Sequence, residues 1–271
     1  MARGISLHIG VNIVDGNHYV GIEDLSFCEA DAISMQALAE KQGFETQLLL
    51  SKQATRGRVT EAIERAAAEL ESGDIFLITY AGHGSSVPDI NRDESREKRR
   101  GAKLDRKDET WCLYDAQQVD DERGQLWSRF KKGVRICILS DSCHSGTAAR
   151  GSADIVPHPQ GFKKRSVSRT SADATYTKNR AFYDSLQRDP EKIEADLLLL
   201  SGCQDHEESG EDSEIGHGNF TFALMDLWQD GGFEGTYADL HKAIREYMPE
   251  WQNPNIYPDR SPLKKEKPFT I

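Results

Sequence analysis

A cysteine and a histidine each follow directly after an apolar stretch of the sequence. Cys143 lies in Ser-Asp-Ser-Cys-His-Ser-Gly after residues 134–139, and His83 lies in Tyr-Ala-Gly-His-Gly-Ser-Ser after residues 75–81. Cysteine attack on a carbonyl carbon needs a thiolate, an imidazole or cation that favours it, and donors for the oxyanion. His83 can supply the imidazole, and the backbone N–H groups of Gly84 and Cys143 can supply the donors. A buried core thiol and a hydrogen-bonded loop histidine are the structural alternatives.

A carboxylate accompanies the cysteine at a spacing that places both on one side of an extended chain. Asp141 precedes Cys143 by two residues, and residues i and i+2 of a strand point the same way. The adjacent His144 points to the opposite side, so we expect a supporting role for it. A carboxylate beside a reactive thiol can pair with an arginine or lysine side chain of a substrate.

The elements that must position these residues alternate between strands and helices. The apolar patterns predict strands at 5–14, 45–50, 74–82, 134–141, 195–202 and 267–271, and helices at 29–41, 59–70, 219–229 and 237–248. Thr236 and Asp239 resemble a capping box at the start of the last helix. This alternation predicts an α/β fold in three layers, with a mostly parallel sheet of about six strands and helices on both faces. Functional sites of such sheets form at the carboxyl ends of the strands.

Two polar segments interrupt the pattern, and we expect both to be long loops. Residues 85–109 are highly charged, and residues 151–194 show little apolar periodicity and many basic side chains. A loop this long inside a domain usually has a function or is disordered.

Composition limits the classes of partner. The net charge of −11 argues against a nucleic-acid partner and favours cationic ligands such as basic peptides. There is no apolar run of 18 residues, so we expect no transmembrane helix. The N-terminus lacks the features of a secretion signal, and the five cysteines form no Cys-x-x-Cys pair. We therefore expect a cytoplasmic protein without a disulfide framework or a structural zinc site.

An ordered set of motifs resembles one enzyme family across nearly the whole chain. The pieces are YAGHGSS, DRKDETWCLYD, SDSCHSG, SGCQDHEES, HGNFTFALMD and WQNPNIY. In this order they are similar to the caspase–haemoglobinase superfamily, in its metacaspase-like (orthocaspase) branch found in bacteria. The resemblance implies the caspase-haemoglobinase fold and cysteine endopeptidase activity.

The resemblance also implies roles for particular residues. Cys143 would be the nucleophile and His83 the general acid/base, and Asp141 would line the specificity pocket. The segment LSFCEADA resembles Leu-x-Gly-Cys-x-Asn-Asp-Ala of the family, which makes Asp31 a second pocket acid. Asp31 could instead be a solvated acid in the first turn of a helix. Two acids in one pocket imply cleavage after arginine or lysine. The chain departs from the family pattern at Phe27, Ala30 and Ala81.

The basic segment lies where caspase-like chains are often cut into two portions. By this reading, 1–271 is one caspase-like domain, with a large portion at 1–150, a linker at 151–194 and a small portion at 195–271. We predict that the intact linker occupies the active site until it is cut or displaced. The candidate positions for self-cleavage are Lys163, Lys164, Arg165, Arg169, Lys178, Arg180 and Arg188.

The remaining expectations concern cofactors and partners. The acidic run 205–214 could be a solvated loop or could bind calcium, but its spacing matches no calcium loop, and we expect no required cofactor and no metal site. We expect protein or peptide substrates with basic residues and a monomer, which a partner protein could regulate. The alternative function is a catalytically silent adaptor that binds basic peptides without cutting them.

Overall fold

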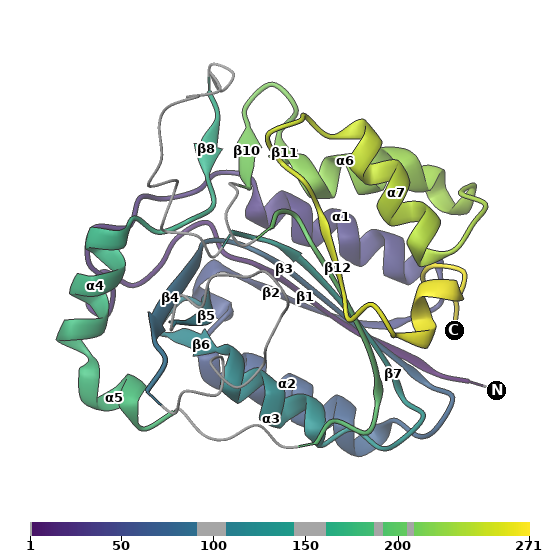
Figure 1. Ribbon diagram of the computed structural model, residues 1–271, viewed down its shortest axis with the longest axis horizontal. Helices are drawn as coiled ribbons and strands as arrows, with labels where there is room; N and C mark the ends of the chain where they lie inside the picture. The colour runs from purple at the N-terminus through teal and green to yellow at the C-terminus, as the bar shows by residue number, and fades with distance from the viewer. Residues whose placement is uncertain (1, 91–106, 144–160, 187–191, 205–208) are drawn as a thin grey trace.

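A six-stranded sheet runs through the centre of the molecule (Figure 1). The computed structural model describes residues 2–90, 107–143, 161–186, 192–204 and 209–271. The strand order is β12–β9–β7–β3–β1–β2, with β12 antiparallel to β9 and all other neighbours parallel. The strands are β1 (Gly4–Gly10), β2 (Glu45–Leu50), β3 (Ile75–Ala81), β7 (Arg135–Asp141), β9 (Asp196–Ser201) and β12 (Asn255–Tyr257). The predicted mostly parallel sheet of about six strands is therefore confirmed.

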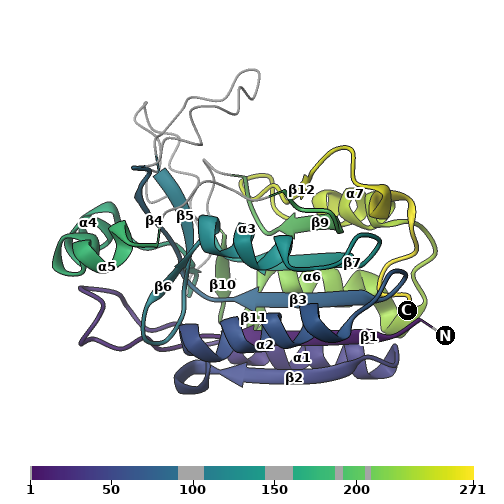
Figure 2. The ribbon, with the colours of Figure 1, turned by 90° about the horizontal axis from the view of Figure 1, so that it is seen from below.

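Helices cover both faces of this sheet, as the alternating pattern predicts. One face carries α1 (Cys28–Lys41), α6 (Asn219–Trp228) and α7 (Tyr237–Tyr247), and the other carries α2 (Arg56–Glu69) and α3 (Asp120–Ser128) (Figures 1 and 2). Each layer of helices packs its apolar side chains against the sheet in a separate core cluster. Short 3₁₀ turns occur at Ser51–Gln53, Gln229–Gly231 and Pro262–Lys265. The predicted capping box of α7 is present, because Thr236 and Asp239 exchange hydrogen bonds.

Two small sheets stand at the carboxyl ends of the central strands, where the sequence predicts no strand. The first contains β4 (Gly84–Pro88), β5 (Lys107–Cys112) and β6 (Gln117–Val119), and the second contains β8 (Lys163–Lys164), β10 (Gly210–Asp212) and β11 (His217–Gly218). Four of these six strands, β6, β8, β10 and β11, have only two or three residues, which is too short for a clear period-two pattern. The loop prediction for 85–109 is therefore wrong at both ends of that segment, and 91–106 lie outside the described residues.

Part of the basic linker folds into two short helices beside the first small sheet. They are α4 (Arg169–Lys178) and α5 (Arg180–Asp184), and both views place them next to β4 and β6 (Figures 1 and 2). Tyr183 of α5 is fully buried, and its hydroxyl is 2.5 Å from Nε2 of His18 and 3.2 Å from Nε2 of Gln117. The sequence did not predict these helices, because only a few of their side chains are apolar.

The C-terminal residues differ from the prediction as well. The last strand is β12, and 267–271 form no strand. Phe269 instead packs into the core against Trp228 and Tyr237. Among the described residues, no helix combines the length and apolar character that a membrane crossing requires.

Candidate active site

His83 is held at the carboxyl end of β3 by its backbone. The Tyr80 hydroxyl donates to the carbonyl oxygen of His83 at 2.7 Å and to that of Cys112 at 3.1 Å. A side chain at Gly82 would collide with the same tyrosine, because its Cβ would lie 2.5 Å from the hydroxyl oxygen. The Tyr80 ring stacks on Trp111 with centroids 4.7 Å apart. The turn that carries His83 is therefore fixed by buried aromatic packing.

The hydrogen bonds of His83 determine its tautomer. Nε2 is 2.8 Å from the carbonyl oxygen of Glu23, and because a carbonyl can only accept, Nε2 carries the proton. Nδ1 is buried and has no hydrogen-bond partner among the described residues. Burial lowers the pKa of His83 below its ordinary value, and the positive charge of Arg165 acts in the same direction, while the Glu23 carbonyl opposes them. A neutral imidazole with a free Nδ1 lone pair can accept a proton.

Cys143 follows β7, the neighbour of β3 in the sheet. The indole N–H of Trp111 donates to the Ser140 hydroxyl at 3.1 Å, and that hydroxyl is 2.9 Å from the hydroxyl of Ser142. Trp111 thus contacts the segment that carries His83 through Tyr80, and the segment that carries Cys143 through Ser140. The Cys143 side chain is buried.

One carbonyl oxygen lies between the two predicted oxyanion donors, and it belongs to Arg165 of the linker. The backbone N–H of Gly84 donates to it at 2.9 Å and that of Cys143 at 3.3 Å. The residues that follow Arg165 remain in the same groove, since the N–H of Val167 donates to the carbonyl oxygen of Gly84 at 2.9 Å. The turns that carry His83 and Cys143 therefore meet around a single peptide group.

The Arg165 side chain fills a buried pocket of carboxylates and is fully buried itself. Nη2 is 2.6 Å from Oδ2 of Asp31 and 3.3 Å from Oε2 of Glu211, and Nη1 is 3.0 Å from Oδ2 of Asp141. The two terminal nitrogens of the guanidinium thus pair with three carboxylates, Nη1 with one and Nη2 with two. The structure therefore brings together the two acids that the sequence indicated, Asp31 and Asp141.

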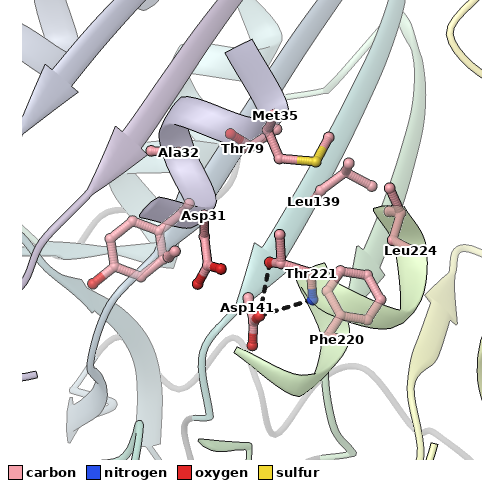
Figure 3. Close-up of a pocket in the computed structure, with 11 residues that line it drawn as sticks. Asp31, Ala32, Met35, Thr79, Leu139, Asp141, Phe220, Thr221 and Leu224 are labelled. Carbon is pink, nitrogen blue, oxygen red and sulfur yellow. Dashed lines mark hydrogen bonds between the residues drawn. The ribbon is translucent and has the colours of Figure 1, made fainter. Parts of the chain in front are cut away.

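Separate elements orient these two acids. Thr221 donates to Oδ2 of Asp141 through its backbone N–H at 3.0 Å and its hydroxyl at 2.8 Å, and Ser209 donates to Oδ1 at 2.8 Å. Asp31 lies 2.8 Å from Nδ1 of His217 and accepts from the N–H of Gly218 at 3.2 Å. Figure 3 shows Asp31 on α1, and Asp141 at the end of β7 with its two bonds to Thr221. The small cavity beside these acids has a volume of about 10 Å³, enough for one water molecule at most.

Glu211 is the site residue that the sequence reasoning missed. It belongs to the acidic run 205–214, for which the sequence left a solvated loop and calcium binding as alternatives, yet it is 1% exposed. Its carboxylate accepts from the N–H of Ser26 at 2.7 Å and of Phe27 at 3.1 Å, beside its contact with Arg165. Its place in β10, next to the linker strand β8, brings it into the pocket. Nothing in its local sequence distinguishes it from the other acids of the run.

In this pocket, burial and the neighbouring opposite charges act in opposite directions on the pKa values of Asp141 and Arg165. Burial raises the pKa of Asp141 above its ordinary value, and Arg165 opposes that rise while the Asp31 carboxylate adds to it. Burial acts to lower the pKa of Arg165, but Cys28 and the three carboxylates outweigh it, so that this pKa lies above its ordinary value. The arginine therefore stays charged, and it compensates carboxylates that would be costly to bury alone.

The other candidate positions for self-cleavage lie elsewhere. Lys163 and Lys164 form β8 and are exposed. Arg169 pairs with Asp173, Arg180 pairs with Asp184, and Nζ of Lys178 donates to the carbonyl oxygen of Asn17. Arg188 lies outside the described residues. Of the described candidates, Arg165 is the one that the structure places in the pocket.

Two further observations bear on chemistry at this edge of the sheet. A cleft of about 420 Å³ runs beside the linker, lined by His83, the segment 21–25 and linker residues between 162 and 168. Within the described ranges, no group of three or more His, Cys, Asp or Glu side chains is arranged to hold a metal ion. Calcium binding by the acidic run stays a prediction, because 205–208 lie outside these ranges.

Comparison with known proteins identifies the family of this chain. The sequence profile of the caspase domain family matches residues 10–265. Metacaspase-1 of Schizosaccharomyces pombe is 24% identical over 285 residues, covering 90% of this chain and 64% of that protein. Metacaspase-1 of Mycosarcoma maydis is 24% identical over 282 residues, covering 90% of this chain and 66% of that protein. The chain therefore spans just under two thirds of the length of each of these relatives.

Two solved structures are also similar to this chain. The crystal structure of a Geobacter sulfurreducens protein is 40% identical and covers 99% of both chains, with a TM-score of 0.82. Caspase-1 of Spodoptera frugiperda is 14% identical, covers 94% of this chain and 86% of its own, and has a TM-score of 0.56, which shows a likeness of fold.

The fold and the site define a caspase-like α/β protein with a cysteine and a histidine at one edge of its sheet. The chain belongs to the caspase domain family, with metacaspases among its relatives. Family membership supports cysteine-protease chemistry.

Proposed function

We propose that this chain is a cysteine endopeptidase that cleaves peptide bonds after arginine or lysine, and that the bond after Arg165 is its first substrate. One observation carries the proposal: Arg165 places its carbonyl oxygen between the N–H groups of Gly84 and Cys143 while its guanidinium pairs with three carboxylates. A peptide held in this way presents its carbonyl carbon to the nucleophile with the oxyanion donors already in place.

The proposed reaction begins when Nδ1 of His83 takes the proton of the Cys143 thiol. The thiolate attacks the carbonyl carbon of Arg165, and the N–H groups of Gly84 and Cys143 stabilise the oxyanion. His83 returns the proton to the departing amine of Ser166, which leaves a thioester on Arg165. Water activated by His83 then releases the Arg165 carboxylate, and the cleft that His83 lines gives water a route to it.

The pocket favours arginine over lysine. A guanidinium offers two terminal nitrogens, and these meet Asp141 on one side and Asp31 with Glu211 on the other. An ammonium group has a single nitrogen and cannot match this fork, so lysine would leave a buried carboxylate poorly compensated. We therefore expect lysine substrates to be cleaved more slowly than arginine substrates.

Peptides that differ only at the residue before the cut test this proposal. We expect cleavage after arginine, slower cleavage after lysine, none after aspartate, and no cleavage by Cys143→Ala. A chain that bound arginine peptides without cutting them would be an adaptor, the alternative that the sequence left open. A thiol-reactive peptide with arginine at its reactive end separates the two, because only an active thiolate is labelled at Cys143.

A further inference from the structure

Cleavage of the Arg165–Ser166 bond would leave each new chain end held by the other portion of the chain. On the carboxyl side, the short strand β8 pairs with β10, and the N–H of Arg165 donates to the carbonyl oxygen of Ser209 at 2.8 Å. The guanidinium also pairs with Glu211 at 3.3 Å. Ser209 and Glu211 both follow the cut in the sequence, so the new carboxyl end stays bound to the portion that begins at Ser166.

The amine side is held directly beside the bond. Ser166 forms a parallel bridge with Gly84, and the N–H of Val167 donates to the carbonyl oxygen of Gly84 at 2.9 Å. The Val167 side chain is 3% exposed and is buried with Tyr19 and Cys112. These contacts are made by the portion before the cut, so they hold the Ser166 nitrogen next to the peptide group from which it came.

The residues that follow attach the amine side to the loop 17–21 through a row of hydrogen bonds. The donors and acceptors are the Ser171 hydroxyl to the Gly21 carbonyl oxygen at 2.8 Å, the Val20 N–H to the Thr175 hydroxyl at 3.0 Å, Lys178 Nζ to the Asn17 carbonyl oxygen at 2.6 Å, and Asn179 Nδ2 to the His18 carbonyl oxygen at 3.0 Å. Tyr183 of α5 adds its contacts with His18 and Gln117. None of these bonds depends on the Arg165–Ser166 bond itself.

We infer that the chain is also a peptide ligase, in which the amine of Ser166 attacks the thioester between Arg165 and Cys143 and restores the peptide bond. This inference rests on the proposed function. The amine nitrogen bonds to the carbonyl carbon, the carbon–sulfur bond breaks, and one proton passes from the amine through His83 to the Cys143 sulfur. Atoms and electrons balance without any further reactant. The thioester therefore has two fates, hydrolysis and rejoining.

The held amine can compete with water because its position is already correct. Reactants that are oriented within one molecule behave as if they were present at effective concentrations of up to about 10⁵–10⁸ M. Both chain ends are fixed before the bond forms, so rejoining does not have to gather them from solution. An α-amine has an ordinary pKa of about 7.7–8.0, so a large share of it is the neutral nucleophile in mildly alkaline buffer.

The position of an oxygen isotope in the full-length chain tests this inference. The wild type self-processes in water enriched in oxygen-18 at about pH 8, and the full-length fraction is then isolated in denaturant. Digestion after glutamate in ordinary water keeps Arg165 and Ser166 in one peptide for mass spectrometry. We expect the heavy isotope in the Arg165 carbonyl group, because a bond acquires it when it is hydrolysed and then rejoined. Cys143→Ala should carry none.

The result separates the ligase from the proposed cleavage. Fragments that end at Arg165, beside a full-length chain that is unlabelled or has disappeared, would overturn the ligase and leave the cleavage standing. A wild-type chain that is neither cut nor labelled would overturn both, because no thioester would have formed.

A matched pair of variants tests the anchoring of the amine. Tyr183→Phe removes a hydroxyl that bonds to His18 and Gln117, on the other side of the cut. Tyr176→Phe removes a hydroxyl that donates to Asp184 at 2.6 Å, on the same side. We expect Tyr183→Phe to lower the ratio of labelled full-length chain to fragments by about 3- to 10-fold, and Tyr176→Phe to leave it unchanged. Both variants should hydrolyse an arginine peptide like the wild type, and equal ratios in the two would refute the role of the held amine.

Discussion

At the residue scale, the Arg165 pocket has one wall with space only for glycine. A Cβ at Gly218 would lie 2.2 Å from Nη1 of Arg165 and 2.3 Å from Oδ2 of Asp141. The backbone there has φ −69° and ψ 142°, a conformation open to any residue. A methyl group at this position therefore changes the space in the pocket and not the path of the chain.

Gly218→Ala should displace the guanidinium from its carboxylates. We expect kcat/KM for arginine peptides to fall about 100-fold or more, because a charged group would lose buried partners. Gly124→Ala is the matched control, since a Cβ at Gly124 in α3 meets no atom within 4 Å. Thermal unfolding of both variants would check the fold, and arginine activity retained by a folded Gly218→Ala would contradict the pocket assignment.

The lowered pKa of His83 sets the acid side of the pH profile. Its ordinary value is 6.5, and burial holds it below this value in the fold. The neutral imidazole that accepts the thiol proton therefore persists below pH 6.5, and activity should be lost as pH falls through the lowered pKa. A kcat/KM profile for an arginine peptide would measure this, and an acid limb centred above pH 6.5 would argue against His83 as the base.

Several residues of the candidate site could be identified from the sequence by their residue type and by their position at the end of a strand. Cys143, His83 and Asp141 could be named because each lies at or just after the end of an apolar strand, at a common edge of the sheet. Arg165 could not be separated from Lys163 and Lys164, which carry the same charge in adjacent positions. Glu211 was missed because it is buried by residues that are distant in sequence, namely Ser26, Phe27 and Arg165.

At the element scale, the two sides of the Arg165–Ser166 bond are anchored differently. Before the bond, the linker has the two-residue strand β8 and the Arg165 pocket. After it, Val167 is buried against Tyr19 and Cys112, and the α4–α5 pair is fixed by Tyr183. Such short elements carry too little pattern to be predicted, whereas the long apolar strands β3, β7 and β9 were placed within about two residues.

Cleavage after Arg165 should leave the two fragments in one folded unit. β9 pairs with β7 in the middle of the sheet through six residues on each strand, and the cut lies outside this pairing. We expect the cleaved protein to elute at the mass of the intact chain, 30.4 kDa, and to separate only in denaturant. Separation in native buffer would show that the linker connection is needed to hold the sheet together.

At the scale of the whole molecule, the central sheet carries a buried histidine. His8 of β1 lies within hydrogen-bonding distance of Thr79 and Ser6, at 2.9 Å from each, and burial lowers its pKa from 6.5 to about 3. The sequence predicted the strand that contains His8. It did not predict the hydrogen bonds of His8 in the core, because Thr79 belongs to another strand that is distant in sequence.

His8 should make the fold sensitive to acid. Its folded pKa is below its unfolded value, so the unfolded state binds more protons between pH 6.5 and about 3. The free energy of unfolding should therefore fall with decreasing pH in this window, by up to ~1.4 kcal/mol per pH unit. Denaturant unfolding of the Cys143→Ala chain would show this slope, and His8→Gln should flatten it. An equal slope in His8→Gln would assign the acid sensitivity to other groups.

The central claim is that the chain binds its own linker as a substrate and cuts it after Arg165. Intact-mass spectrometry of freshly purified protein tests this most directly. The wild type should yield fragments that end at Arg165 and begin at Ser166, while Cys143→Ala and Arg165→Ala remain whole at this bond. Fragments of the same mass from Cys143→Ala, or a wild-type chain that stays uncut at Arg165 and inert toward arginine peptides, would contradict the claim.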